Sequence, residues 1–81
     1  MPKKIRLLYV YRLRAGFSQE GLAEKVGVPQ ESISTWEGGL SIPEEHLQKL
    51  WEIFDQEGVL PKGGSPAILE EEFGGDIKTN D

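Results

Sequence analysis

Residues 18–39 read SQEGLAEKVGVPQESISTWEGG and decide the fold. They contain two short helical patterns, residues 19–26 and 30–38. In the tight turn between them, Gly27 supplies a left-handed stop for one helix and Pro29 suits the first position of the next. Apolar side chains gather on one side of this unit: Phe17, Leu22, Ala23, Val26, Val28, Ile33 and Trp36. The pattern predicts a helix–turn–helix pair, whose second helix can probe the major groove of DNA.

The flanking segments extend the prediction to an all-α bundle of four to five short helices. Residues 5–14 read as a first helix whose apolar residues spread over more than one face. A further helix follows the pair, starting either with a capping box from Ser41 to Glu44 or with Pro43 at its first position. Its core stripe repeats at helical spacing and consists of Leu47, Leu50, Trp51 and Phe54.

The chain after Gly58 is interrupted by proline and glycine and is expected to be mostly loop, with one short helix within residues 67–73. We expect three parts: a helix–turn–helix domain at 1–58, an extension at 59–75 that packs on the bundle, and a disordered tail at 76–81. The extension would cover the apolar surface of the first helix. The alternative is that this surface mediates self-association.

Composition restricts the class of protein. Eighty-one residues with 37% apolar content make one small domain. The absence of cysteine excludes disulfides and thiolate metal sites, and the longest apolar run, residues 7–11, is far too short to span a membrane. We therefore expect a cytoplasmic protein with no membrane association.

Charge is distributed unevenly along the chain. The net charge is −5, but residues 1–14 contain five basic residues and no acidic one. The remaining residues hold four basic residues against all fourteen acidic ones. One end of the protein could therefore attract phosphate while the other repels it.

Nothing in the sequence predicts catalysis. His46 is the only histidine and lies in the polar first turn of a helix, where it is most simply solvated. Glu44, Glu45 and His46 are sequence neighbours, and adjacent helical positions diverge around the axis and make a poor metal cage. The acidic run Glu70–Glu72 reads as a solvated face. The chain is therefore interpreted as a non-enzyme without a metal or cofactor.

The spacing of apolar, glycine and polar residues from Ser18 to Gly39 resembles the helix–turn–helix of phage repressor and Cro proteins, the lambda-repressor-like or xenobiotic-response-element type. The resemblance covers roughly residues 5–54. It implies that the third helix enters the major groove of double-stranded DNA, as part of a homodimer. By position, it assigns DNA contacts to Gln19, Gln30, Glu31, Ser32, Ser34 and Thr35.

The residues themselves agree with part of this assignment. With Ile33 and Trp36 facing inward, the exposed or flanking positions are Gln30, Glu31, Ser34 and Thr35. A glutamine can pair with adenine N6 and N7, and Gln19 at a helix N-terminus is placed to bind a phosphate. Glu37 lies one turn after Ile33 and points inward. In the resembled family this position commonly forms an ion pair with the position of Arg12, and we expect that pair here.

The sequence also departs from the family pattern. The loop after the third helix lacks its usual basic residue, Glu31 adds a negative charge, and residues 26–48 contain no Lys or Arg. The usual fifth helix is not recognisable either. The missing basic residues are expected to weaken phosphate binding, and the departures together leave a second hypothesis open. In it, the same fold is an acidic protein-interaction module, such as an antitoxin or a regulatory subunit, with a protein partner in place of DNA.

Overall fold

Four α-helices make up most of the structure, a computed structural model that describes residues 5–73. The helices are α1 (Leu7–Ala15), α2 (Gln19–Val26), α3 (Gln30–Glu37) and α4 (Glu44–Gln56). A 3₁₀ helix, η1 (Pro66–Glu70), and two short strands, β1 (Ile5–Arg6) and β2 (Glu72–Phe73), accompany them. The described chain is therefore an all-α bundle of short helices, as predicted, with an antiparallel ribbon that the sequence did not reveal.

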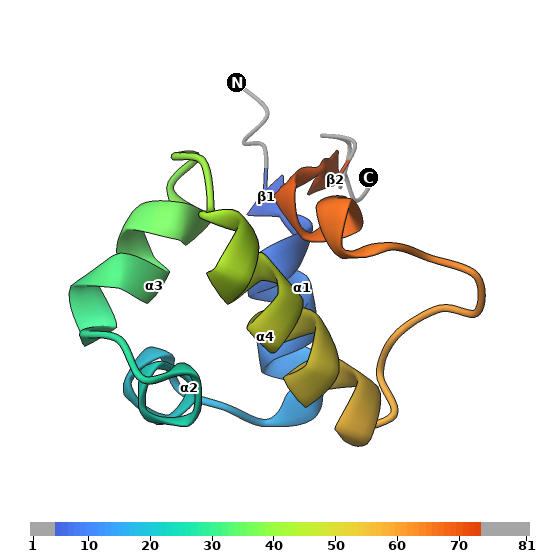
Figure 1. The fold of residues 1–81 in the computed structure, drawn as a ribbon, viewed down its shortest axis with the longest axis horizontal. Coiled ribbons are helices and arrows are strands. Elements are labelled where there is room, and N and C mark those ends of the chain that lie inside the picture. The colour runs from blue at the N-terminus through green and yellow to red at the C-terminus, as the bar shows by residue number, and fades with distance from the viewer. Residues whose placement is uncertain (1–4, 74–81) are drawn as a thin grey trace, which may run out of the picture.

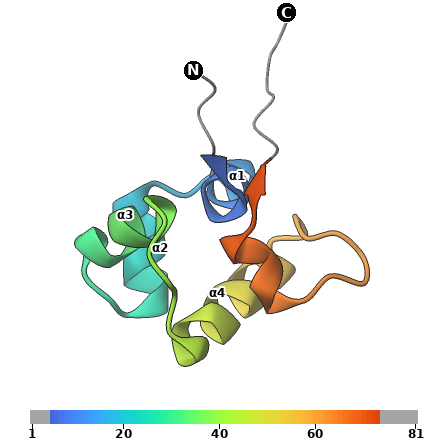
Figure 2. The same ribbon diagram turned by 90° about the horizontal axis from the view of Figure 1, so that it is seen from above.

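The core lies where α1 and α4 meet the helix–turn–helix pair. Figure 1 shows α2 and α3 on one side of α1 and α4, with η1 and the β1–β2 ribbon near the N-terminal end of α1. Figure 2 shows the same arrangement from above. The most completely buried large side chains come from all of these helices and from η1: Leu8, Leu22, Ile33, Leu50, Phe54 and Leu69. One core therefore holds the helix–turn–helix pair against the rest of the chain.

The start of α2 and the turn between α2 and α3 are fixed by local backbone chemistry. The Ser18 hydroxyl accepts a hydrogen bond from the Gly21 N–H (2.9 Å) and caps α2, as expected. Gly27 ends that helix with φ of +93°, a conformation that costs glycine little. Pro29 is the N-cap of α3 and not its first helical residue, because its ψ of 153° is extended. Helix α3 accordingly begins at Gln30.

Two further helix starts differ from the sequence prediction. The first helix begins at Leu7 because Ile5 and Arg6 instead pair with Phe73 and Glu72 in the ribbon. Helix α4 begins at Glu44 with Pro43 as N-cap and no side-chain cap, so neither predicted start of this helix is correct. Proline supplies φ near −65° at either position, so its presence alone cannot place the boundary.

The segment that follows α4 packs on the bundle as far as the structure describes it. The short helix predicted within residues 67–73 is the 3₁₀ helix η1, which begins earlier and ends at Glu70, and the last residues of that range form β2. The Leu7 N–H donates to the Glu71 carbonyl (2.8 Å), and this bond to a distant residue draws the segment into extended backbone after η1. Leu69 of η1 is fully buried. Residues 74–81, which include the predicted disordered tail, lie outside the described residues.

The extension leaves part of α1 uncovered. Tyr11 is buried and packs against Phe54 with ring centroids 6.1 Å apart. On the outer side, Tyr9 and Leu13 are 36% and 52% exposed. The apolar first helix thus uses one side for the core and keeps two large side chains at the surface.

The burial of Leu69 predicts that the extension contributes to stability. Leu69→Ala removes a fully buried side chain and should lower the free energy of unfolding by about 2–5 kcal/mol. Urea denaturation followed by circular dichroism measures this change. The matched control is Leu40→Ala, because Leu40 is 62% exposed and its truncation should change stability by less than about 0.5 kcal/mol. Equal unfolding midpoints for the two variants would contradict the prediction.

Candidate nucleic-acid interface

The outer side of α3 is a solvent-exposed polar surface. Ile33 and Trp36 are buried and orient the helix. The exposed residues of α3 are Gln30, Glu31, Ser34 and Thr35, all of them predicted DNA contacts. Ser32, the remaining predicted contact on α3, is half-buried. Helix α3 therefore presents a surface with hydrogen-bonding groups near its N-terminus and no basic side chain of its own.

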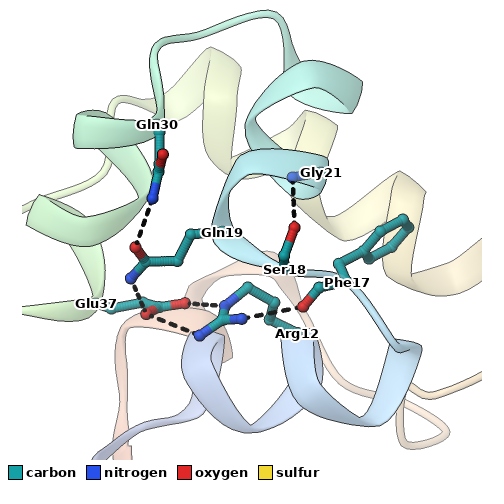
Figure 3. A network of polar contacts seen from close by, with 7 residues as sticks. All are labelled: Arg12, Phe17, Ser18, Gln19, Gly21, Gln30 and Glu37. Atoms are coloured by element: carbon teal, nitrogen blue, oxygen red, sulfur yellow. Dashed lines mark hydrogen bonds and ion pairs between the residues drawn. The ribbon is translucent and has the colours of Figure 1, made fainter.

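The side chain of Gln30 belongs to a hydrogen-bonded network. Its side-chain Nε2 donates to Oε1 of Gln19 (3.3 Å), and Gln19 Nε2 in turn donates to Oε1 of Glu37 (2.9 Å). These contacts join the first residue of α3, the first residue of α2 and the last residue of α3 (Figure 3). The two ends of α3 are thus connected through the side chain that begins α2.

Arg12 of α1 anchors this network. Its Nε donates to Oε2 of Glu37 (2.5 Å), its Nη2 reaches Oε1 of the same carboxylate (3.4 Å), and its Nη1 donates to the Phe17 carbonyl (3.0 Å). The side chains of Arg12 and Glu37 are only 9% and 8% exposed. The Arg12 guanidinium also lies 5.3 Å from the centre of the Tyr9 ring. The structure therefore brings together the two residues for which the sequence predicted an ion pair, inside the bundle.

The carboxylate of Glu37 sets the direction of the whole network. An ionised carboxylate only accepts hydrogen bonds, so Gln19 must turn its NH₂ group toward Glu37 and its carbonyl oxygen toward Gln30. Gln30 must then donate from its NH₂ group. This leaves the carbonyl oxygen of Gln30 and its second N–H for an external ligand, which is the pair of groups that adenine N6 and N7 require.

Two residues near α3 had no assigned role from sequence. Arg6 of β1 donates through Nη1 to the carbonyls of Trp36 (2.9 Å) and Leu40 (2.8 Å), and through Nη2 to that of Gly39 (3.1 Å). Glu70 of η1 accepts from the Ile42 N–H (2.7 Å), so this member of the acidic run is half-buried and bonded, contrary to the expectation of a solvated face. Both residues act on the turn between α3 and α4. The contacts span 28 residues or more, so no local sequence signal indicates them.

Two of the three basic residues that the structure describes within residues 1–14, Arg6 and Arg12, are committed to contacts within the chain. Arg12 is neutralised by Glu37, and Arg6 is bonded to three carbonyls. Lys3 and Lys4 lie outside the described residues, and Arg14 is exposed. The basic end of the sequence therefore does not become a general basic surface in the described part of the chain.

The described residues show no arrangement suited to a metal. Within residues 5–73, no group of three His, Asp or Glu side chains is placed to hold an ion. His46 packs on Trp36 with ring centroids 5.4 Å apart and is not a fully solvated residue. Across the same residues, no helix combines the length and apolar character that a membrane crossing requires.

The family of the chain follows from its sequence profile as well as from this geometry. The family described as Helix-turn-helix matches residues 8–57, which is more than half of the chain. The chain therefore belongs to this family, the lambda-repressor and Cro-like helix–turn–helix proteins, and is of the DNA-binding regulator type. Comparisons with curated proteins and with solved structures gave no match.

The buried ion pair predicts a large stability effect. Glu37→Ala would leave the Arg12 guanidinium buried without its counter-ion and should lower the free energy of unfolding by about 3–5 kcal/mol. Thermal and urea unfolding measure the loss. Glu52→Ala, at an exposed position of α4, is the matched control and should be nearly neutral. If the two variants unfold alike, the pair does not stabilise the bundle.

Proposed function

We propose that this protein is a sequence-specific transcriptional regulator of the phage repressor and Cro type, which binds operator DNA with α3 in the major groove. The observation that carries the proposal is the orientation of Gln30 by the Glu37–Gln19 network at the exposed start of α3. A glutamine that is already oriented loses little side-chain freedom on binding, which favours affinity and specificity. Such a regulator would act in the cytoplasm, where bacterial and phage operators lie.

Five of the six predicted contact residues, all except the half-buried Ser32, have a role that their chemistry supports. Gln30 would read an adenine through two hydrogen bonds. Gln19 bonds both neighbours but retains one N–H of its amide, which could reach a phosphate near the start of α2. Ser34 and Thr35 offer hydroxyl groups to base edges, and Glu31 could accept a hydrogen bond from cytosine N4.

A single domain of this kind has only one α3 to insert. Helix–turn–helix proteins commonly bind as dimers to two half-sites spaced by one helical turn of DNA. We propose that this chain binds as a homodimer to a pseudo-palindromic site. Selection of bound duplexes from a random pool tests both proposals, because the recovered sequence shows whether two related half-sites are present.

The network makes a specific prediction for Gln30. Gln30→Ala should weaken binding to the selected duplex by about 1–3 kcal/mol and relax the preference at one base pair in each half-site. Fluorescence anisotropy on the selected duplex and on single-base variants measures both effects. Gln48→Ala is the matched control, since Gln48 is an exposed glutamine of α4. Equal losses on selected and random duplexes would contradict the assigned base contact.

The structure changes what is expected for Gln19. From sequence alone, Gln19→Ala should weaken all DNA sites similarly, because Gln19 was assigned only to a phosphate. In the structure Gln19 also holds Gln30 (3.3 Å). Gln19→Ala is therefore expected to reduce the preference at the Gln30 base pair as well.

A second candidate function is supported by charge and by the surface of α1. The net charge is −5, α3 carries Glu31 and no basic residue, and Tyr9 and Leu13 remain exposed. These features suit an acidic module that binds a protein, such as an antitoxin or regulatory subunit. The anisotropy titration separates the two functions. If no duplex pool is bound even at about 50 mM salt, where phosphate contacts are strong, the result would favour the protein partner.

A further inference from the structure

The turn between α3 and α4 is exposed and has no basic residue of its own. Residues 38–41 are all solvent-exposed, and residues 26–48 contain no Lys or Arg. This turn follows directly on the helix that is proposed to enter the major groove. An eight-residue helix is about 12 Å long, similar to the width of that groove. With its N-terminal residues at base edges, its C-terminal end must lie close to the sugar–phosphate strand that borders the groove.

Carbonyl groups without a hydrogen-bond donor at this position would disfavour the approach of a DNA phosphate. The last carbonyls of a helix carry partial negative charge, which repels phosphate. In this protein a cation from another part of the chain lies on them. The Arg6 guanidinium bonds the carbonyl of Trp36 in the last turn of α3, and those of Gly39 and Leu40 in the turn itself (2.8–3.1 Å).

We propose that Arg6 supplies the positive charge that the turn lacks and contacts a DNA phosphate beside the C-terminal end of α3. This inference rests on the proposed function. Arginine has five N–H donors and can accept none, and the three carbonyl bonds use three of them. The Nε group is buried, whereas the bonds to Gly39 and Leu40 are solvent-exposed, so the remaining N–H of Nη2 is the donor that a phosphate could reach.

The position of Arg6 is determined by the C-terminal extension. Arg6 pairs with Glu72 across the β1–β2 ribbon, and the Leu7 N–H donates to the Glu71 carbonyl (2.8 Å). From η1, Glu70 holds the other end of the same turn through the Ile42 N–H (2.7 Å). Because residues 26–48 contain no Lys or Arg, the assigned role of Arg6 is a direct phosphate contact and not part of a general basic field.

The salt dependence of DNA binding tests the inference. Each phosphate contact contributes about −0.9 to the slope of log K against log salt concentration. Arg6→Met should therefore reduce the magnitude of the slope by about 0.9, and Arg6→Lys, which keeps the charge, should restore most of it. Lys62→Met is the matched control, because it removes the same charge from the exposed loop between α4 and η1, far from α3 (Figure 1). Its slope should equal that of the wild type.

Each outcome either supports or overturns the inference. Circular dichroism at the assay temperature shows whether each variant is folded, and Arg6→Gln replaces Arg6→Met if the latter does not fold. An unchanged slope for the neutral Arg6 variant overturns the assignment, as does an equal loss for Lys62→Met. If Arg6→Lys loses as much slope as Arg6→Met, Arg6 only shapes the turn and the phosphate contact is wrong. Absence of salt-dependent binding by the wild type overturns the proposed function, and this inference with it.

Discussion

Burial of the Arg12–Glu37 pair constrains the rest of the helix–turn–helix arrangement. Two opposite charges that are less than one-tenth exposed must satisfy each other, because an unpaired buried charge costs several kcal/mol. Arg12 also bonds the Phe17 carbonyl, and Glu37 also accepts from Gln19. The pair therefore fixes α1, the start of α2 and the end of α3 relative to one another. The side chain of Gln30 is oriented at the exposed end of the same hydrogen-bonded series.

The placement of the basic side chains bears on how an acidic protein could bind a polyanion such as DNA. The protein has nine basic residues, and the structure commits Arg12 to the interior and Arg6 to the end of α3. A net charge of −5 weakens the long-range attraction to DNA. Under the proposed function, binding would then depend on a few oriented groups, including Arg6 and Gln30. Such an interface would have a shallow salt dependence, and base contacts would contribute a larger share of its affinity.

The extension after α4 packs on the bundle in place of the fifth helix that is expected in this family. Leu69 enters the core, and β2 pairs with β1 so that both ends of the described chain meet beside α1. Arg6 of β1 and Glu70 of η1 also bond to the turn that follows α3. A segment that is remote from the helix–turn–helix pair in sequence is therefore in direct contact with the turn that follows α3.

The sequence by itself determined the elements that depend on local chemistry. Ser18, Gly27 and the periodic apolar residues predict α2, the turn and α3, because capping, left-handed backbone and helical spacing involve residues only a few positions apart. The same spacing also predicted which residues of α3 face outward. Tertiary structure decided the ribbon, the Gln19–Gln30 contact and the roles of Arg6 and Glu70. Strand pairing and side-chain bonds over 28 residues or more depend on how the whole chain packs, and no local pattern in Arg6 or in the Glu70–Glu72 run specifies their partners.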